Sequence, residues 1–259
     1  MTNIVLNLLL SYNYQMFKDS IMSLWTITTT IVYTVFLGIP AIFIALFSKT
    51  GKAPFKMARP WAWLIMKTNR VKLVVEGLEN IAKNNSYVFI SNHSSNLDPL
   101  AVARAIPQTL RFVGKKSLAK IPIFGWACRL GKIIFIDRAD SQAAVETINK
   151  TAKDLKDGIS AYFFAEGTRS KDGHLQAFKK GGIVFAMRAK LPIVPITILG
   201  SHSLLPKNAF RIRPGIMKII VGDPIDTSSY SENDKESVLQ QVRSIISSNI
   251  EQYGEARQS

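Results

Sequence analysis

The sequence predicts an α/β fold in which helices cover a mixed, largely parallel sheet, preceded by an N-terminal hydrophobic membrane helix or helical hairpin. Three observations support this prediction. Short apolar runs recur from residue 71 onward, and several are too uniformly apolar to have a face in solvent. Stretches with helical periodicity lie between these runs or after them. A long segment without any charged residue precedes Lys49.

The predicted strands are short apolar runs bounded by turn residues, and there are seven of them. They cover residues 71–75, 87–91, 110–113, 133–136, 161–164, 193–199 and 217–221. Helical periodicity predicts helices over residues 140–156, 178–190 and 232–253. A shorter helix is expected over residues 99–106, where Pro99 suits the first helical position and Asp98 is a candidate N-cap.

The N-terminal segment is uncharged between Asp19 and Lys49. At about 1.5 Å per residue, residues 21–47 are longer than a hydrocarbon core of ~30 Å requires, so they are predicted to enter a membrane. A cleavable signal peptide fits less well, because it would begin with basic residues and residues 1–17 carry no charge. Gly38 and Pro40 leave open whether this segment is one helix or a re-entrant hairpin.

Basic residues dominate the stretch that follows: Lys49, Lys52, Lys56, Arg59, Lys67, Arg70 and Lys72. Such an excess is typical of the cytoplasmic side of a membrane and attracts anionic headgroups. Trp61 and Trp63 suit an interfacial helix, although a buried helix of the soluble part is an alternative. We therefore expect a membrane anchor and interfacial helix over residues 1–70 and an α/β domain over residues 71–259, located at the cell (inner) membrane and facing the cytoplasm.

Composition restricts the class of protein further. The 259 residues include 47% hydrophobic residues, which excludes a disordered chain. A formal net charge of +15 requires an anionic partner: nucleic acid, an anionic membrane surface or a phosphorylated substrate. The single Cys128 excludes an internal disulfide, and no Cys/His cluster has the spacing of a zinc site, so no metal is expected.

Common enzyme motifs of α/β proteins are absent from the sequence. Five residues separate Gly125 from Gly131 where a P-loop has four, and Ile133 stands where Ser or Thr would bind Mg²⁺. The sequence contains no Gly-x-Ser-x-Gly, His-Glu-x-x-His or Gly-x-Gly-x-x-Gly motif. Serine hydrolases of the nucleophile-elbow type, zinc proteases and dinucleotide-binding enzymes are therefore disfavoured.

Two polar motifs directly follow predicted strands. The first contains His93 and, five residues later, Asp98, a spacing that allows a base and its orienting carboxylate. The second is Phe164-Ala165-Glu166-Gly167-Thr168-Arg169-Ser170, in which a glycine turn and an arginine can bind phosphate. Two weaker segments are Gly131-Lys132-Ile133-Ile134-Phe135-Ile136-Asp137-Arg138 and Leu191-Pro192-Ile193-Val194-Pro195.

In this order, the four segments resemble the four motifs of the glycerolipid acyltransferase family. The resemblance covers roughly residues 70–225, and it is specific because four spaced motifs coincide. Lys116 also lies in a segment similar to the family's basic segment. One departure is Ala165, where the family usually has proline before the glutamate. The resemblance implies transfer of a fatty acyl group from an acyl thioester to the sn-2 hydroxyl of 1-acyl-glycerol-3-phosphate, giving phosphatidic acid.

The resemblance also implies residue roles. His93 would act as general base and Asp98 would hold its other ring nitrogen, with direct transfer and no protein nucleophile. The residues implied to bind the phosphorylated acceptor are Lys116, Arg138, Glu166, Gly167, Thr168 and Arg169. Glu166 would instead orient Arg169 or bind a glycerol hydroxyl if it does not face the phosphate. Ser91, Ser94 and Ser95 near the histidine leave a covalent route as a minor alternative.

The partners implied by the resemblance are membrane phospholipids, lysophosphatidic acid and an acyl donor, either acyl-CoA or acyl carrier protein. No cofactor and no nucleic acid are expected. Two alternatives stay open: an acyltransferase for another acceptor, such as glycerol-3-phosphate or a lyso-aminolipid, and a non-catalytic basic protein that binds a membrane surface or nucleic acid. His174 and His202 are left without a role.

Overall fold

The computed structural model describes residues 2–136, 146 and 150–255. The helices are α1 (Thr2–Leu46), α2 (Lys52–Phe55), α3 (Ala58–Thr68), α4 (Asp98–Ala105), α5 (Phe124–Leu130), α7 (Gly181–Ala189), α8 (Ser201–Leu204) and α9 (Lys235–Glu255), with short 3-10 turns η1 (Leu78–Asn80), η2 (Lys116–Lys120) and η3 (Glu232–Asp234). The strands are β1 (Val71–Glu76), β2 (Val88–Ser91), β3 (Thr109–Lys115), β4 (Ile134–Ile136), β5 (Ile159–Phe164), β6 (Ile193–Leu199) and β7 (Gly215–Val221).

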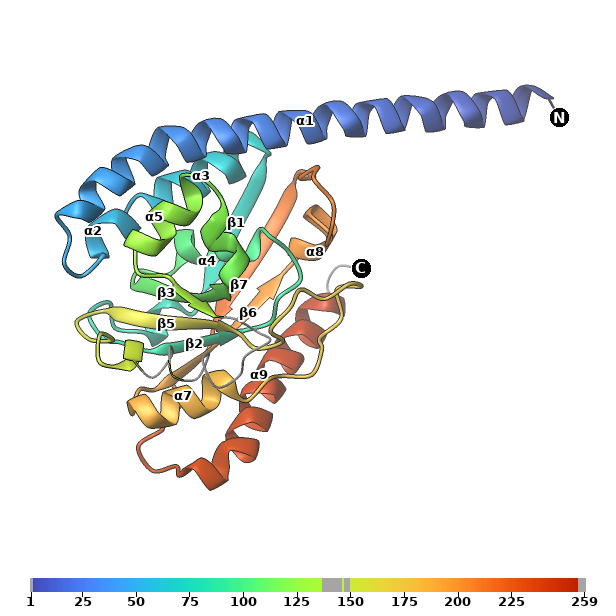
Figure 1. Ribbon diagram of the computed structural model, residues 1–259. Coiled ribbons are helices and arrows are strands. Elements are labelled where there is room, and N and C mark those ends of the chain that lie inside the picture. Colours follow the sequence, from blue (N-terminus) through green and yellow to red (C-terminus); the bar gives the residue numbers. More distant parts are fainter. Residues whose placement is uncertain (1, 137–145, 147–149, 256–259) are drawn as a thin grey trace.

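The seven strands form one sheet in the order β1-β7-β6-β2-β5-β3-β4 (Figure 1). Strands β6, β2, β5, β3 and β4 are parallel to one another, while β7 pairs antiparallel with β6 and parallel with β1. The mixed, largely parallel sheet is therefore confirmed, and each predicted strand run overlaps one observed strand. Five parallel strands bring their carboxyl ends to the same edge of the sheet, where ligands of open α/β sheets bind.

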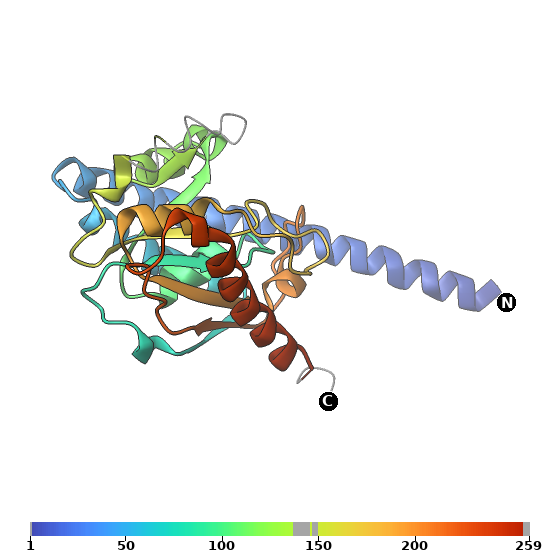
Figure 2. The same ribbon diagram turned by 90° about the horizontal axis from the view of Figure 1, so that it is seen from below.

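Both faces of the sheet are buried, which explains the uniformly apolar strand sequences. On β2, Phe89 belongs to one hydrophobic core and its neighbour Ile90 to the other. On β5, Tyr162 and Phe163 divide in the same way, because successive side chains of a strand point to opposite faces. Helices α3 and α4 cover the first core, and α7 and α9 cover the second (Figures 1 and 2).

The predicted helices agree with the structure in position more than in length. Helix α7 is shorter than the predicted 178–190, and most of the predicted helix 140–156 lies outside the described residues. Helix α9 starts three residues later than predicted, because residues 232–234 form the 3-10 turn η3. Ser231 caps that turn, and the Ser231 and Asp234 side chains satisfy each other's backbone amides.

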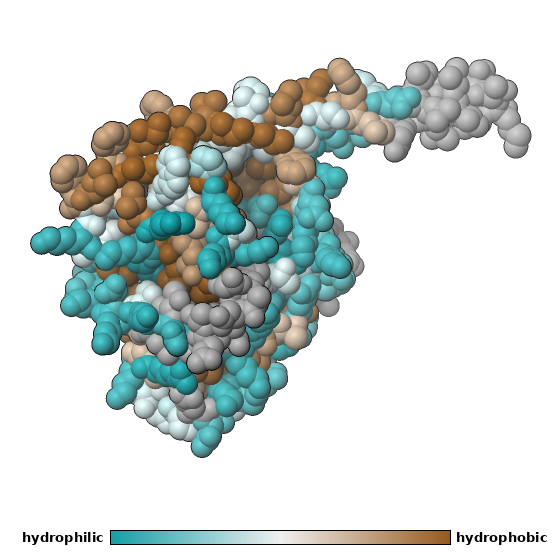
Figure 3. All heavy atoms as spheres, in the orientation of Figure 1, coloured by the Kyte–Doolittle hydropathy of each residue, from teal (hydrophilic) through white to brown (hydrophobic). Residues whose placement is uncertain are grey.

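Helix α1 is one continuous helix with Gly38 and Pro40 inside it, so the alternative of a re-entrant hairpin within residues 20–48 is not what the structure shows. Among the described residues, it is the helix that is long and apolar enough to cross a membrane: Asn13–Leu46 has a mean hydropathy of 2.1, with 17% of the scored window buried. Its exposed side forms an apolar band along one side of the molecule (Figure 3). These features fit membrane association.

The other side of α1 docks on the domain through a row of polar contacts. Thr26 Oγ1 donates to Asn69 Oδ1 at 2.9 Å, and the Tyr33 and Thr68 hydroxyls are 2.8 Å apart. Trp61 Nε1 donates to Thr34 Oγ1 at 3.1 Å. Helix α3 buries Ile65 and Met66 in the core and leaves Trp63 exposed, so it combines a core face with a solvent-facing aromatic.

The turn after α1 is fixed to the sheet by Arg111, a fully buried side chain on β3. Its guanidinium donates to the carbonyl oxygens of Thr50 and Gly131, the latter at 2.7 Å. Burial lowers the pKa of Arg111 to about 10, which leaves the guanidinium charged at neutral pH. The end of the anchor and the segment before β4 are therefore held by the same residue.

Candidate active site

The predicted site residues follow strands whose carboxyl ends share one edge of the sheet. The loop with His93 follows β2, the loop 165–170 follows β5, and Lys116 begins the turn η2 directly after β3. Arg138 follows β4 but lies outside the described residues. The parallel pairing of β2 with β5 thus places the His93 loop beside the loop 165–170.

His93 and Asp98 form a hydrogen-bonded pair. The distance between His93 Nδ1 and Asp98 Oδ2 is 2.7 Å, and Asp98 is fully buried, with 0% of its side chain exposed. The same carboxylate oxygen accepts the backbone amides of Ser94 and Ser95, each at 2.8 Å. Since Nδ1 is engaged, Nε2 is the ring nitrogen left to accept a proton from a substrate.

The interpretation of Asp98 as an N-cap is wrong. Helix α4 starts at Asp98 itself, its N-cap is Leu97, and no side chain caps it. The Asp98 carboxylate turns back to the preceding loop because two amides and the imidazole there give it three donors. Pro99 still occupies the first helical turn, as expected.

The His93 imidazole is also held from the side by an aromatic ring. Its centroid is 3.9 Å from that of Phe164 at the end of β5, and the two rings are stacked with an interplanar angle of 22°. Only 14% of the His93 side chain is exposed. The ring is thus fixed by Asp98 at one nitrogen and by Phe164 on one face, which leaves little rotational freedom.

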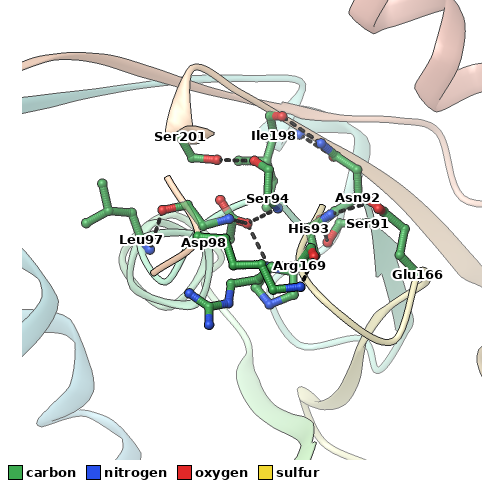
Figure 4. Close-up of polar contacts among 12 residues, drawn as sticks. Ser91, Asn92, His93, Ser94, Leu97, Asp98, Glu166, Arg169, Ile198 and Ser201 are labelled. Carbon is green, nitrogen blue, oxygen red and sulfur yellow. Dashed lines mark hydrogen bonds and ion pairs between the residues drawn. The ribbon is translucent and has the colours of Figure 1, made fainter. Parts of the chain in front are cut away.

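Three further contacts hold the loop between β2 and α4, and the sequence analysis gave them no role. Asn92 exchanges two hydrogen bonds of 2.8 Å with the backbone of Ile198 on β6. The hydroxyls of Ser94 and Ser201 are 2.8 Å apart. Ser95 Oγ donates to Leu205 O at 2.8 Å. These contacts use the Ser94 and Ser95 hydroxyls for structure, which argues against a covalent serine route. Figure 4 shows the contacts of Asn92 with Ile198 and of Ser94 with Ser201.

Glu166 lies on the other side of His93 from Asp98 (Figure 4). Its Oε1 accepts the backbone amide of His93 at 2.8 Å, and its Oε2 accepts that of Gln176 at 3.3 Å. Burial raises the pKa of Glu166 to about 7, although both of these hydrogen bonds act to lower it. Glu166 is therefore buried and supports the His93 loop through the loop's backbone. This role differs from the phosphate-binding role implied by the resemblance.

The loop 167–170 is a turn that needs glycine at its start. Gly167 has φ +69°, and a Cβ there would lie 2.9 Å from two carbon atoms of Lys179. Thr168 is exposed and Arg169 is partly exposed. Ser170 N donates to His93 O at 2.9 Å, so Arg169 is one residue from a direct contact with the histidine loop.

Two lysines missed by the sequence analysis approach this turn. The Lys179 side chain packs over Gly167. Lys207 Nζ donates to Arg169 O at 2.9 Å and to Thr168 Oγ1 at 3.4 Å. Lys207 lies 37 residues or more from the turn in sequence, so only the folded chain reveals this concentration of positive charge.

Other candidate groups stay outside the site. Burial raises the pKa of Cys128 to about 12, so its thiol is a poor nucleophile at neutral pH. His174 is exposed in a loop, and His202 lies in the short helix α8. Within the part of the chain that the structure describes, no group of three His, Cys, Asp or Glu residues could hold a metal ion.

The fold and the paired histidine and aspartate are compatible with several classes of α/β enzyme, and comparison with known proteins selects one of them. The Acyltransferase family model matches residues 72–199, and the chain belongs to that family. Its relatives include 1-acyl-sn-glycerol-3-phosphate acyltransferases from Arabidopsis thaliana (chloroplastic; 35% identical over 61% of this chain and 44% of that protein) and Saccharomyces cerevisiae (30% identical over 83% and 72%). The chain thus spans less than half of the Arabidopsis relative.

A solved structure has the same fold. The crystal structure of the 1-acyl-sn-glycerophosphate (LPA) acyltransferase PlsC from Thermotoga maritima matches with a TM-score of 0.78 at 25% identity. The match covers 92% of this chain and 97% of the Thermotoga chain, so it includes the region of α1 as well as the sheet.

Proposed function

We propose that this protein transfers a fatty acyl group from an acyl thioester to the sn-2 hydroxyl of 1-acyl-glycerol-3-phosphate, producing phosphatidic acid for phospholipid synthesis. The observation that carries the proposal is the His93–Asp98 pair at 2.7 Å, located at the sheet edge that also carries the arginine turn. A base beside a cationic turn suits an acceptor that has both a hydroxyl and a phosphate.

The proposed reaction is a direct transfer. Nε2 of His93 removes the proton of the acceptor hydroxyl while the hydroxyl oxygen attacks the thioester carbonyl, giving a tetrahedral intermediate. The intermediate collapses to the new ester and expels the thiolate, which takes the proton back from His93. Asp98 stabilises the imidazolium between these steps and keeps the proton on Nδ1. All atoms and charges balance without a cofactor or a resident metal.

Arg169 and Lys116 are proposed to bind the acceptor phosphate, together with Thr168 of the turn and Arg138 after β4. The Gly167 amide itself donates to Phe164 O at 3.0 Å, so Gly167 serves the phosphate by shaping the turn. Charge-assisted hydrogen bonds to phosphate are roughly twice as strong as neutral ones. Lys179 and Lys207 add positive charge around the turn. Glu166 supports this site indirectly, because it holds the backbone of His93 and of Gln176.

The proposed location is the cell (inner) membrane, with the catalytic domain on its cytoplasmic face. The apolar band of α1 would lie in the lipid, and the basic residues that follow it would meet anionic headgroups. The acyl donor is then a soluble thioester of coenzyme A or of acyl carrier protein. Both donors are anionic, which suits a formal net charge of +15.

The deciding experiment compares acceptors with the purified full-length protein. Two radiolabelled donors are used in turn, acyl-CoA and acylated acyl carrier protein. Each is offered with lysophosphatidic acid, glycerol-3-phosphate or a lyso-aminolipid in mixed micelles. We expect phosphatidic acid from lysophosphatidic acid at a kcat/KM at least about tenfold above the other acceptors. Preference for another acceptor, or transfer that survives His93→Ala, would contradict the proposal.

A further inference from the structure

A second apolar and basic surface lies between β3 and β4, on the turn η2 and helix α5. Four large apolar side chains of this segment face outward: Leu118, Ile121, Trp126 and Leu130, with 40%, 44%, 56% and 38% exposed. A soluble surface rarely gathers so many large apolar groups within thirteen residues. Something other than water is expected to cover them.

The same segment carries only positive charge. Residues 115–132 contain Lys115, Lys116, Lys120, Arg129 and Lys132, all exposed, and no Asp or Glu. Aromatic and aliphatic side chains interleaved with lysine and arginine are the composition of segments that lie in the interface of an anionic membrane. Long basic side chains can reach phosphate groups while their neighbours enter the acyl region.

Helix α5 also lies against the membrane anchor. It packs directly against α1, where the position of a Gly38 Cβ would be 2.7 Å from Ile123 Cγ2. Its first residue, Phe124, also contacts Trp61 of α3, with ring centroids 5.7 Å apart. Figure 1 shows α5 beside the C-terminal half of α1, whose exposed side is the apolar band of Figure 3. The second surface therefore adjoins the proposed membrane contact.

We propose that the η2–α5 segment is a second membrane-binding surface, which inserts Ile121 and Trp126 into the interface of an anionic bilayer. This inference rests on the membrane location given under the proposed function. Because η2 starts at Lys116 on the site edge of the sheet, the segment brings the lipid headgroup region to the acceptor site. It would let lysophosphatidic acid reach His93 without leaving the lipid layer.

An acidic helical protein such as acyl carrier protein is the other partner that such a surface could suit. The adjoining apolar band of α1 favours the bilayer, since a protein partner at this position would compete with the lipid. The experiment distinguishes the two partners.

The first test locates Trp126 in vesicles. Trp25, Trp61 and Trp63 are replaced by Phe, which leaves Trp126 as the remaining one of four tryptophans, and circular dichroism and activity check the fold. In vesicles with 30% anionic lipid, brominated acyl chains should quench Trp126 emission, and iodide should not. Iodide quenching that equals that of free tryptophan would overturn the proposal.

The second test separates membrane contact from catalysis. Ile121→Asp and Trp126→Ala should lower acylation of bilayer-embedded lysophosphatidic acid about tenfold or more, because each removes apolar contact with lipid. Both should keep wild-type kcat on a short-chain, water-soluble lysophosphatidic acid with acyl-CoA. Trp126→Phe is the matched control and should behave as wild type in both assays.

The outcomes have distinct meanings. Equal activity of Ile121→Asp and wild type on bilayer substrate would overturn the membrane surface while leaving the proposed function intact. A loss confined to acyl carrier protein as donor would overturn it in favour of a protein-docking surface. Absence of transfer by the wild type to both bilayer-embedded and soluble lysophosphatidic acid would instead refute the proposed function itself.

Discussion

Asp98 holds His93 through the same oxygen, Oδ2, that accepts the amides of Ser94 and Ser95. The histidine and the backbone of its own loop are thus fixed by one buried atom. Orientation of the imidazole and shape of the loop cannot change independently, which suits a base that has to meet a hydroxyl at a defined position.

His93→Ala should lower kcat about 10²–10⁴-fold, the usual contribution of general-base catalysis. Acyl transfer to lysophosphatidic acid measures it, with His174→Ala as the control for an exposed histidine in a neighbouring loop. If His93→Ala kept near-wild-type turnover, His93 would not be the base.

Asp98→Asn should lower kcat severely while changing the KM of the acceptor little. The amide can still accept one backbone hydrogen bond, but it cannot stabilise the imidazolium or fix its tautomer as a carboxylate does. Steady-state kinetics with varied acceptor separates the two parameters. A change confined to KM would assign Asp98 to substrate binding.

Arg169→Ala and Lys116→Ala should raise the KM of lysophosphatidic acid about tenfold or more, with little change in the KM of the thioester. A charge-assisted hydrogen bond contributes about 1.5–3 kcal/mol. Lys83→Ala is a matched control, because Lys83 is exposed in the loop before β2, at the opposite edge of the sheet. An unchanged acceptor KM in both site variants would place the phosphate elsewhere.

Glu166→Gln should flatten the pH dependence of stability. Burial raises the pKa of Glu166 to about 7, so between about pH 4.5 and 7 the folded chain keeps a proton that the unfolded chain releases. The folded state therefore loses stability as pH rises through this window, by on the order of 3 kcal/mol. Denaturant unfolding in detergent at pH 4.5 and pH 8 compares both proteins, and identical changes would refute a buried titrating carboxyl.

Asn92→Ala should destabilise the protein by about 1–3 kcal/mol, because the buried amide and carbonyl of Ile198 lose their partner. It should also lower kcat, since Asn92 precedes His93 and ties its loop to β6. Denaturation midpoints and acceptor kinetics are measured together. A stability loss with unchanged kcat would show that the tie has no part in positioning His93.

The strands and the histidine–aspartate pair were predictable because both depend on local patterns. Uniform apolar runs indicate strands buried on both faces, and motifs directly after parallel strands must meet at one edge. The role of Asp98 at α4 was predicted wrongly, because a helix-start pattern does not show where a carboxylate points. Its three donors in the preceding loop decide that, and they depend on the fold of the loop.

The remaining contacts of the site depend on residues far apart in sequence. Asn92 pairs with Ile198, Ser94 with Ser201, and Lys207 with the Arg169 turn. No periodicity or spacing encodes such pairs. The structure also changes the interpretation of Glu166, since its burial between two loop amides is set by tertiary packing rather than by its neighbours in the motif.

Arg111 has a mechanical consequence. By donating to the carbonyls of both Thr50 and Gly131, it restricts the motion of the segment that joins the anchor to the sheet. In the proposed membrane location, this tie would keep the catalytic edge at a constant distance from α1. The tilt and depth of that helix would then set how far His93 lies from the bilayer, and the protein would meet successive lipid acceptors by lateral diffusion.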